Sequence, residues 1–598
     1  MKRLLCLATA TLIAVTVGPD RAAAFDVSVQ SEDGTLASEI RAASLVAAIK
    51  DDTEAEPATP IDILSAAQAD YGRIIALLYD AGYFGPTINI LVDGREAAAI
   101  SPVQPPARVN SVVLSVDAGP VFRFGRIGIS PKAEGTEGTD GFAPGETARV
   151  SVLRSATAAH IEGWRKQGHA KARVAGQSIT ARHPDRVIDA AVTLDPGPRL
   201  RLGKLTITGE SAVREARLRE IAGWPSGAVF DPDDLALVQK RLRRTGTFGT
   251  ANLTEAETPN PDGTLDVTAT INDQLPRRYS FGAEFGTLDG LTLSGSWLHR
   301  NIFGGAERLL VEGEVAGIAG DTGGIDYAIS AKLSRPATFR TDLEAFGLVA
   351  FEQEDEVNYF ARTASIEVGT LYFASDDREY SYGVGLQTAK TRDDLGERTY
   401  TIATLSFRAT FDRRDNALDA TSGYYAEIGL TPFVSLGGTD DGLLTTLDLR
   451  TYRQVGSRVT LAFRGLLGSV AGPSLADAPA DFLFYSGGGG TVRGQGYQSL
   501  GVDLSPTVTV GGRSFVGLSG EVRVKTGRNL SVVGFYDAGY IGPESFFDGQ
   551  DGEWHSGVGA GIRYDTGIGP IRFDMAVPAS GPDDGSGLEI YIGIGQSF

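Results

Sequence analysis

The chain has 598 residues, with 75 acidic against 55 basic side chains and a formal net charge of −20. This length exceeds what a single hydrophobic core supports, so we expect several domains. The strong negative charge argues against a phosphate-backbone partner, and we therefore expect no nucleic acid to bind.

The N-terminus has the pattern of a secretory signal peptide over residues 1–24. Two basic residues precede an apolar run from Leu4 to Val17, and small residues follow up to Ala24. That run is too short to span a membrane but has the length of an export signal. The only cysteine, Cys6, lies inside it, so the exported chain would hold together without disulfides. No later run of eighteen apolar residues predicts a spanning helix, which leaves the closed β-barrel as the other way to cross a bilayer.

A repeat runs through the segment that follows. The stretches "VDAGPVFRFGRIGI" and "LDPGPRLRLGKLTI" align without gaps, and Asp117 of the first meets Asp195 of the second. The same step of 78 residues from Asp195 leads to Asp273. This periodicity predicts three modules, at residues 25–118, 119–197 and 198–276.

Each module is expected to run from a strand through helices to further strands. A predicted helix ends at a glycine in each one, at Gly82, Gly168 and Gly246, where a left-handed cap forms at little cost. In the third module Asp231 is the expected N-cap. The predicted buried helix faces are Ile63, Ala67, Tyr71, Ile74 and Leu78 in the first module and Leu235, Val238 and Leu242 in the third. Such α/β modules leave an unpaired sheet edge that can accept an extended client strand.

From residue 277 to residue 598 the pattern changes to a period of two. In the last stretch, "LEIYIGIGQSF", large apolar residues alternate with polar or small ones almost to the end. Lipid outside and water inside a barrel require this alternation. A soluble β-sandwich is the alternative, but about 320 residues exceed its ordinary size. At roughly 20 residues per strand and connection, the segment predicts about 16 antiparallel strands.

The sequence predicts no enzyme, no cofactor and no metal site. The glycine-rich stretch from Tyr485 to Gly501 could cradle a nucleotide phosphate around Arg493, but a strand-like run follows it where a phosphate loop needs a helix. No two of the five histidines lie close enough in sequence for a metal pair on one helix. Acidic pairs such as Asp393–Asp394 stand among loop-forming residues.

Three modules followed by a barrel resemble the outer-membrane assembly factor superfamily that includes BamA and TamA, and most of all its TamA-like members. The modules resemble POTRA domains, and five of them, as in BamA, would need about 400 residues where about 250 are present. The resemblance implies an α+β region of three periplasmic POTRA modules and an all-β transmembrane barrel in the outer membrane of a Gram-negative bacterium.

Several short motifs carry this resemblance. "HRNIFGGAERL" is similar to a turn after the second barrel strand, "FDRRDNALDATSGYY" to a mid-barrel signature, and "GFYDAGY" and "GIGPIRFDMAVP" to motifs near the end. The residues they place in the family's barrel motif are Asn301, Phe303, Gly304, Asp412, Asp415, Gly423, Gly539, Gly569, Pro570 and Arg572. Phe598, an aromatic residue at the end of an alternating strand, is the expected C-terminal assembly signal.

The glycine-rich stretch resembles the family's long loop that folds back into the barrel lumen, whose signature is Val-Arg-Gly-Tyr. The resemblance implies that Arg493, with Gly494 beside it, tethers this loop by pairing with Glu521 and Asp537. This sequence departs from the signature, because Gln495 follows Gly494 and the tyrosine comes only at Tyr497. The aromatic contact is then either supplied two residues later or lost.

The resemblance implies assembly or translocation of outer-membrane proteins. Its expected partners are an inner-membrane-anchored TamB-like protein, unfolded outer-membrane protein or autotransporter clients, and outer-membrane lipid. Clients would enter through a seam between the first strand, around Tyr279 to Gly286, and the last, Leu588 to Phe598. Gly593 and Gly595 either weaken this seam or leave room for bulky lumen neighbours. Three alternatives remain: a two-partner secretion transporter for a dedicated exoprotein, a factor in phospholipid transport, and a passive porin.

Overall fold

The computed structural model describes residues 25–52, 58–286, 290–320, 323–505, 508–527, 529–547, 551–566, 569–581 and 587–594. The predicted signal peptide at 1–24, Gly595 and the predicted assembly signal at Phe598 lie outside these ranges. Within them, no helix is long and apolar enough to cross a membrane. Residues Lys204–Pro225, Leu235–Ala256 and Asp266–Phe598 form one compact unit, and the rest of the chain forms a second.

The first α/β module pairs a four-stranded sheet, in the order β1-β4-β2-β3, with three helices. Its elements are β1 (Asp26–Gln30), α1 (Gly34–Ala43), α2 (Leu45–Asp51), α3 (Pro60–Ala81), β2 (Thr87–Val92), β3 (Arg95–Glu96) and β4 (Ser111–Asp117). The predicted face of α3 is confirmed: Ile63, Ala67, Ile74 and Leu78 are buried and Tyr71 packs beside them. Gly82 caps this helix at a φ of 93°, in the left-handed region that the sequence predicted.

The second module has a three-stranded sheet in the order β5-β7-β6 and a single α-helix. Its elements are β5 (Arg123–Ser130), α4 (Val150–Lys166), β6 (Arg173–Arg182) and β7 (Val187–Asp195). Several helices were expected between its first two strands, and the described chain has only α4 there. The preceding stretch, "EGTEGTDGFAPGET", explains the difference, because glycine, threonine and proline disfavour a helix interior.

The third module repeats this sheet, in the order β8-β10-β9, with two helices. Its elements are β8 (Arg201–Thr208), α5 (Glu215–Ala222), α6 (Pro232–Arg244), β9 (Phe248–Glu255) and β10 (Thr264–Asp273). Asp231 accepts a hydrogen bond from the backbone N–H of Asp233 at 2.9 Å, as an N-terminal cap does. The predicted face of α6 is confirmed, because Leu235, Val238 and Leu242 are buried.

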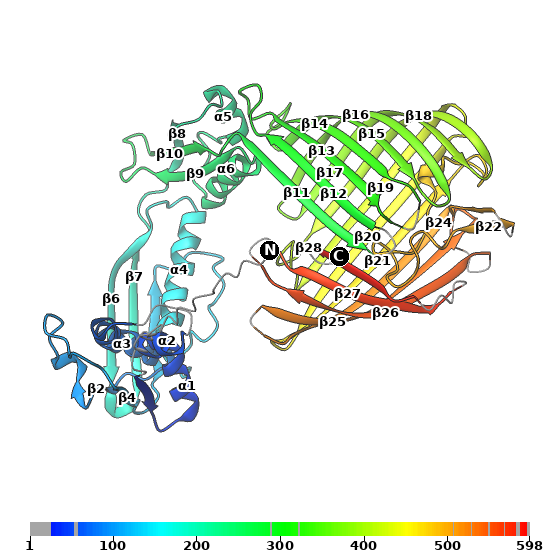
Figure 1. The fold of residues 1–598 in the computed structure, drawn as a ribbon. Helices are drawn as coiled ribbons and strands as arrows, with labels where there is room; N and C mark the ends of the chain where they lie inside the picture. Colours follow the sequence, from blue (N-terminus) through cyan, green and yellow to red (C-terminus); the bar gives the residue numbers. More distant parts are fainter. Residues whose placement is uncertain are drawn as a thin grey trace, which may run out of the picture. The chain divides into compact units, whose positions relative to one another are not determined.

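The described part of the remaining chain forms a closed antiparallel barrel of 16 strands (Figure 1), which confirms the predicted fold class. The barrel strands are β11 (Arg277–Gly286), β12 (Gly290–His299), β13 (Arg308–Ile318), β14 (Asp326–Arg335), β15 (Leu343–Asp355), β16 (Tyr359–Ser375), β17 (Arg378–Asp393), β18 (Gly396–Asp412), β19 (Gly423–Gly437), β20 (Gly442–Val455), β21 (Val459–Ala471), β24 (Ser514–Lys525), β25 (Leu530–Gly542), β26 (Glu553–Tyr564), β27 (Ile571–Ser580) and β28 (Glu589–Ile594).

Alternation along the strands separates an outer apolar face from an inner one. On β25, Val532 and Tyr536 are exposed, whereas Phe535 and Asp537 between and beside them are buried. Because successive side chains of a strand point to opposite faces, Asp537 faces the interior of the barrel. The same alternation puts Glu521 of β24 and Asp574 of β27 on inner faces.

The connection between β21 and β24, residues 472–513, is the longest in the described barrel. It contains the short helix η3 (Ala480–Phe482) and the hairpin of β22 (Val502–Ser505) with β23 (Val508–Val510). Isolated bridges from Phe484 to Gly512 and from Ser486 to Leu500 hold the two arms of this connection together. We call residues 472–513 the lumen loop, because its middle lies against the inner wall described next.

Candidate functional site: an arginine tether inside the barrel

Arg493, in the middle of the lumen loop, is only 2% exposed and binds carboxylates on three different strands. Its guanidinium grips Asp537 of β25 with two hydrogen bonds, from Nε at 2.7 Å and Nη2 at 3.0 Å. Nη1 donates to Glu521 of β24 at 2.8 Å and lies 3.4 Å from Asp574 of β27. The loop is therefore fastened to three strands, through residues that lie 28, 44 and 81 positions away from Arg493 in the sequence.

The ring of Phe535 lies under the same guanidinium, with its centroid 3.5 Å from the Arg493 Cζ. A cation placed over an aromatic face gains electrostatic attraction, and the gain grows when the pair is removed from water. The planar arginine thus uses its edge for carboxylates and its face for the ring. A lysine in this place offers neither geometry.

The charges around the tether are balanced. Three buried carboxylates, Glu521, Asp537 and Asp574, face three buried arginines. The two other arginines are Arg523, which donates to Glu521 at 2.8 Å, and Arg563, which pairs with Asp574. Because a buried charge is tolerated only when it is paired and hydrogen-bonded, removal of any one of the six leaves a net charge in the site.

Backbone contact between loop and wall depends on glycines from both sides. Gly494 has a φ of 89°, and a Cβ on it would lie 2.6 Å from the carbonyl oxygen of Val577 on β27. A Cβ on Gly557 of β26 would lie 1.9 Å from the carbonyl oxygen of Arg493. No side chain fits at either distance, so the loop can reach the wall only where both partners lack one.

Gln495 replaces the signature tyrosine with an amide that bridges two strands. Its Nε2 donates to the carbonyl oxygens of Ser556 at 2.7 Å and Ser580 at 2.9 Å. Tyr497 points elsewhere, and its hydroxyl donates to Glu356 at 2.9 Å. A tyrosine hydroxyl from the wall still contacts this part of the loop, because that of Tyr591 on β28 accepts a hydrogen bond from the Gly494 N–H at 3.2 Å.

The lumen loop has a second attachment on the opposite stretch of the wall. Asp481 of η3 accepts hydrogen bonds from Gln387 Nε2 of β17 at 2.6 Å and from the hydroxyl of Tyr400 on β18. This loop residue stands outside the spanning strands, and burial, together with nearby Glu354, raises the pKa of Asp481 to about 7. The loop is thus attached both to β17 and β18 and to β24, β25 and β27.

The predicted Asn-x-Phe-Gly turn connects the barrel with the third module. Asn301 Oδ1 accepts the Ala306 N–H at 2.9 Å, which closes the turn. The side chain of Phe303 is exposed, while its carbonyl oxygen accepts Arg214 Nη1 at 2.7 Å. The carbonyl oxygen of Gly304 accepts the Arg214 N–H at 2.9 Å.

A second contact joins the third module to the turn between β14 and β15. Asp342 accepts Arg241 Nη2 at 2.6 Å and Arg244 Nη2 at 2.9 Å. Although partial burial of Asp342 raises its pKa, the two arginines outweigh that effect and hold the pKa below its usual range. The third module is therefore fixed to the barrel by charged side chains.

The mid-barrel residues build the turn between β18 and β19. Asp412 forms two hydrogen bonds with Arg414, and the Asp415 carboxylate accepts the backbone N–H groups of Thr421 and Ser422. Gly423 has a φ of 95° and begins β19. These residues hold a turn and lie apart from the tether.

The remaining predicted motif residues lie in three places. Gly539 of β25 lies against the loop, because a Cβ on it would lie 2.2 Å from Ser486 Oγ. Gly569 and Pro570 immediately precede β27. Arg572 of β27 forms an ion pair with Glu284 of β11.

The barrel closes through a ladder between β11 and β28. Within the described residues this seam has two residue pairs, Phe285 with Ile592 and Gly286 with Tyr591. The other side of β11 pairs with β12 at ten positions. Arg572 faces Gly593 across the β27–β28 ladder, and a Cβ on Gly593 would lie 2.9 Å from Arg572 Nε. Of the two explanations offered for this glycine, the geometry favours room for a bulky neighbour.

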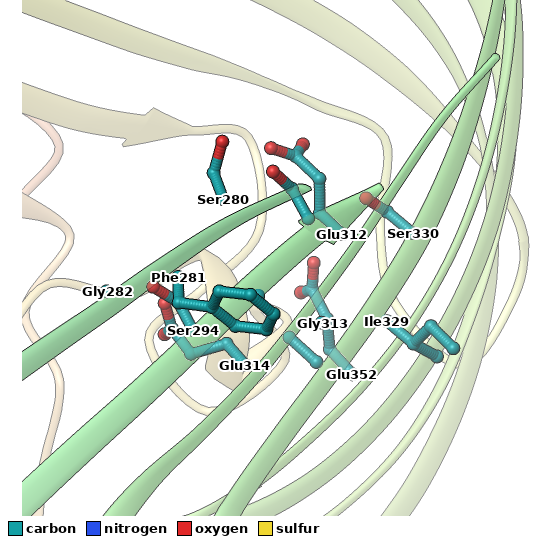
Figure 2. Close-up of a pocket in the computed structure, with 13 residues that line it drawn as sticks. Ser280, Phe281, Gly282, Ser294, Glu312, Gly313, Glu314, Ile329, Ser330 and Glu352 are labelled. Atoms are coloured by element: carbon teal, nitrogen blue, oxygen red, sulfur yellow. The ribbon is translucent and has the colours of Figure 1, made fainter. Parts of the chain in front are cut away.

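Next to the seam, the inner wall is lined by small and acidic side chains. A cavity of about 500 Å³ lies there. Glu312, Glu314 and Glu352 are among its lining residues (Figure 2). Serines and glycines of β11 and β12, such as Ser280 and Ser294, complete this part of the wall. A wall of small and acidic side chains is suited to contact with water or with polar groups of an extended chain.

Sequence reasoning named Arg493, Glu521 and Asp537, and it missed Asp574, Arg563 and Phe535. Asp574 stands two residues after Arg572, on the same face of β27, so the period of two was the available signal. Register between strands decides which inward residue meets the loop, and a single sequence does not contain it. Among the described residues, no group of three or more His, Cys, Asp or Glu is placed to hold a metal ion.

Fold and site together define a class: a closed barrel preceded by α/β modules, with a long loop fastened to its inner wall by a buried arginine. Residues 301–598 match the model of the Omp85 superfamily domain. Two curated relatives are named outer membrane protein assembly factor BamA. The one from Nitratidesulfovibrio vulgaris is 24% identical over 426 residues, which is 67% of this chain and 51% of the relative. The one from Neorickettsia risticii is 21% identical over 503 residues, or 78% and 64%.

Solved structures share the fold. BamA from Haemophilus ducreyi lacking POTRA domains 1–3 superposes with a TM-score of 0.61 at 17% identity, covering 79% of this chain and 99% of that one. CdiB from Acinetobacter baumannii superposes with a TM-score of 0.51 at 12% identity, covering 79% and 89%. The family model thus covers the barrel from residue 301 onward, and the two solved structures show that the fold is shared. The chain spans about half to two thirds of the length of these two curated relatives.

Proposed function

We propose that this chain is an outer-membrane assembly or translocation factor of the TamA-like type. It inserts or secretes protein clients, autotransporters among them, without nucleotide or cofactor. Residues 25–118, 119–197 and 198–276 are its three periplasmic POTRA modules, and residues 277–598 its barrel. That the chain is not an enzyme remains a prediction.

The observation that carries this proposal is the seam between β11 and β28. Its described ladder of two pairs contrasts with ten pairs on the other side of β11. Backbone hydrogen bonds of a ladder add up, so within the described residues the β11–β28 ladder parts at a lower cost than the β11–β12 ladder. A parted seam offers the edge of β11 to a client strand, and edge pairing is a recognised mode of protein binding.

The lumen loop supports the same function by occupying the interior. A passive porin needs an open channel, whereas here a 42-residue connection at 472–513 is fastened to the wall at Arg493 and Asp481. We infer that Arg493, Gly494, Tyr497, Glu521 and Asp537 hold this loop and that the ten barrel-motif residues shape turns and wall positions of the barrel. Phe598 remains the proposed C-terminal assembly signal.

A reversible lock on the seam tests this function. Phe285 and Ile592 are register partners, and opposite residues of antiparallel strands lie near the Cβ separation that a disulfide needs. The double variant Phe285→Cys/Ile592→Cys should lose client insertion when oxidised and regain it when reduced. The matched control is Phe285→Cys/Leu291→Cys, which locks β11 to β12 instead. Equal activity of the oxidised seam variant and its control would reject lateral client entry.

The proposed partner is an inner-membrane-anchored, TamB-like protein that contacts the first module. Deletion of residues 25–118 should abolish its co-purification from membranes while the barrel still inserts. Retention of the partner by the shortened chain would contradict this. Co-purification of one dedicated exoprotein instead would favour two-partner secretion. Loss of outer-membrane phospholipid with normal client insertion would favour lipid transport.

A further inference from the structure

Three basic side chains gather at one rim of the barrel, on neighbouring strands. Arg362 of β16 stands directly opposite Lys390 of β17, and Phe360 stands opposite Arg392. We call Arg362, Lys390 and Arg392 the basic rim cluster. This rim is the one opposite the turns at Phe303, Asp342 and Asp376 that contact the third module.

The cluster faces outward. On β16 the flanking residues Tyr359 and Ala361 are buried, and on β17 the flanking residues Ala389 and Thr391 are buried. Because side chains alternate along a strand, Arg362, Lys390 and Arg392 point away from the lumen, and all three are exposed. They therefore line the outside of the barrel, where lipid surrounds it.

The arrangement concentrates positive charge. Like charges directly opposite each other on paired strands repel, and Arg362 with Lys390 is such a pair. The guanidinium groups of Arg362 and Arg392 both lie over the single ring of Phe360, at 5.2 and 5.4 Å from its centroid. Glu397 pairs with Lys390 at 2.7 Å and offsets one of the three charges. In a chain with a net charge of −20, a surplus of this kind points to an anionic ligand.

An apolar surface continues from the cluster along the same outward rows. Ile366 and Val368 of β16 are 51% and 59% exposed, and Leu386 and Val384 of β17 are 49% and 59% exposed. They follow Arg362 and Lys390 at steps of two residues along their strands, with one residue of the same face between. A ligand that covers both regions needs an anionic head and a long apolar tail.

We propose that the basic rim cluster binds the phosphate group of an anionic lipid in the bilayer leaflet at this rim. A shallow cavity of about 330 Å³, lined by Phe360, Arg362, Lys390, Thr391, Arg392 and Glu397, receives the headgroup. The acyl chains lie along the apolar rows of β16 and β17. The inference rests on the membrane placement of the barrel and not on client assembly.

The test compares lipid retention in the full chain and two charge-matched variants. The cluster variant is Arg362→Gln/Lys390→Gln/Arg392→Gln. The control variant, Arg453→Gln/Arg458→Gln/Lys525→Gln, removes three exposed cations at the opposite rim of β20, β21 and β24. Both are placed in phosphatidylcholine nanodiscs that contain a phosphorylated lipid A, and bound lipid is counted by native mass spectrometry.

We expect the cluster variant to bind lipid A at least about tenfold more weakly than the unaltered chain, because each cation near an anionic headgroup adds to binding. The control variant should bind like the unaltered chain. Glu397→Gln should strengthen binding, since it removes the carboxylate that competes for Lys390. Heat-modifiable migration of each variant on gels shows independently that its barrel has folded.

Two results would overturn the proposal. One is equal lipid binding by the folded cluster and control variants. The other is displacement of lipid A by inorganic phosphate at the same concentration. That result would show that the cluster binds a soluble anion and that the apolar rows do not contribute to binding. A steep loss of binding with added salt, present in the unaltered chain and weaker in the cluster variant, would support it.

Discussion

Arg572 of β27 forms an ion pair with Glu284 of β11, reaching across β28. The strand between them makes room for this contact, because Gly593 of β28 has no side chain at the place where Arg572 crosses. Arg572 is almost buried, while Glu284 is about half exposed. The first strand and the second-last strand of the barrel are thus joined directly, over a seam with a short described ladder.

We expect Glu284→Gln to loosen the seam slightly. A half-exposed ion pair contributes less than about 1 kcal/mol, so the barrel should still fold. The temperature at which the heat-modifiable form is lost should fall by a few degrees at most. The exchange variant Glu284→Arg/Arg572→Glu should restore this temperature to that of the unaltered chain. A folded exchange variant whose transition temperature stays low would show that the ion pair does not contribute to barrel closure.

Gly593→Ala should imitate the loss of this ion pair. The added Cβ would stand 2.9 Å from Arg572 Nε, and a flexible side chain moves aside more easily than backbone. The variant should therefore have little further effect when combined with Glu284→Gln, because both remove one interaction. The thermal stability of the two single variants and the double variant measures this, and additive losses would contradict it.

Arg493→Ala should release the lumen loop while the barrel remains inserted. The change leaves Asp537 and two further buried carboxylates facing two arginines, and breaking a buried pair costs roughly 3 to 5 kcal/mol. Limited proteolysis from outside should then cut residues 487–512, which should stay protected in the control Arg453→Ala. Asp537→Asn should reproduce much of this effect, and the double change should cost less than the sum. Protected loops in both single variants would reject the tether.

Attachment of the loop at Asp481 should depend on pH. Its pKa is raised to about 7, above the ordinary value of 3.8, so protonation favours the attached state. The contribution to stability is complete below pH 4 and is lost as the pH rises through about 7. Proteolysis of the loop should thus be faster at pH 8.5 than at pH 5. Asp481→Asn should remove this difference, whereas Asp477→Asn, which changes an exposed carboxylate of the same loop, should preserve it.

Asp342→Asn should free the third module from the barrel turn. The carboxylate accepts hydrogen bonds from both Arg241 and Arg244, and an amide cannot balance two guanidinium groups. We expect faster proteolysis between residues 245 and 276, with unchanged heat-modifiable migration. The control is Asp440→Asn, an exposed carboxylate in a turn of the opposite rim. Equal proteolysis of the two variants would show that other contacts fix the module.

The sequence predicted those parts of the fold that repeat. The period of two predicted a barrel, and the length of that segment predicted about 16 strands, as the fold confirms. The 78-residue step that sets the module boundaries remains a prediction. The expectation of several helices was wrong for the second module, which has only α4 between β5 and β6, because glycine and threonine prevail in the segment before it. Local composition decided the outcome there.

The candidate site was less accessible from sequence. Arg493 stood out as a lone cation among glycines, but its third carboxylate, Asp574, lies 81 residues away and meets it only through strand register. The basic rim cluster had no signal at all, since Arg362 and Lys390 become neighbours only when β16 pairs with β17. Contacts across a sheet depend on a register that composition and spacing do not encode.

The order of the tether's parts along the chain has a consequence for how the protein matures. Arg493 is synthesised before Glu521, Asp537 and Asp574, and these three stand on strands that join the sheet in succession. A half-finished barrel that ends before β25 has an arginine in its interior without the carboxylate that grips it twice. Capture of Arg493 is therefore a late event, and it stabilises the docking of β24, β25 and β27.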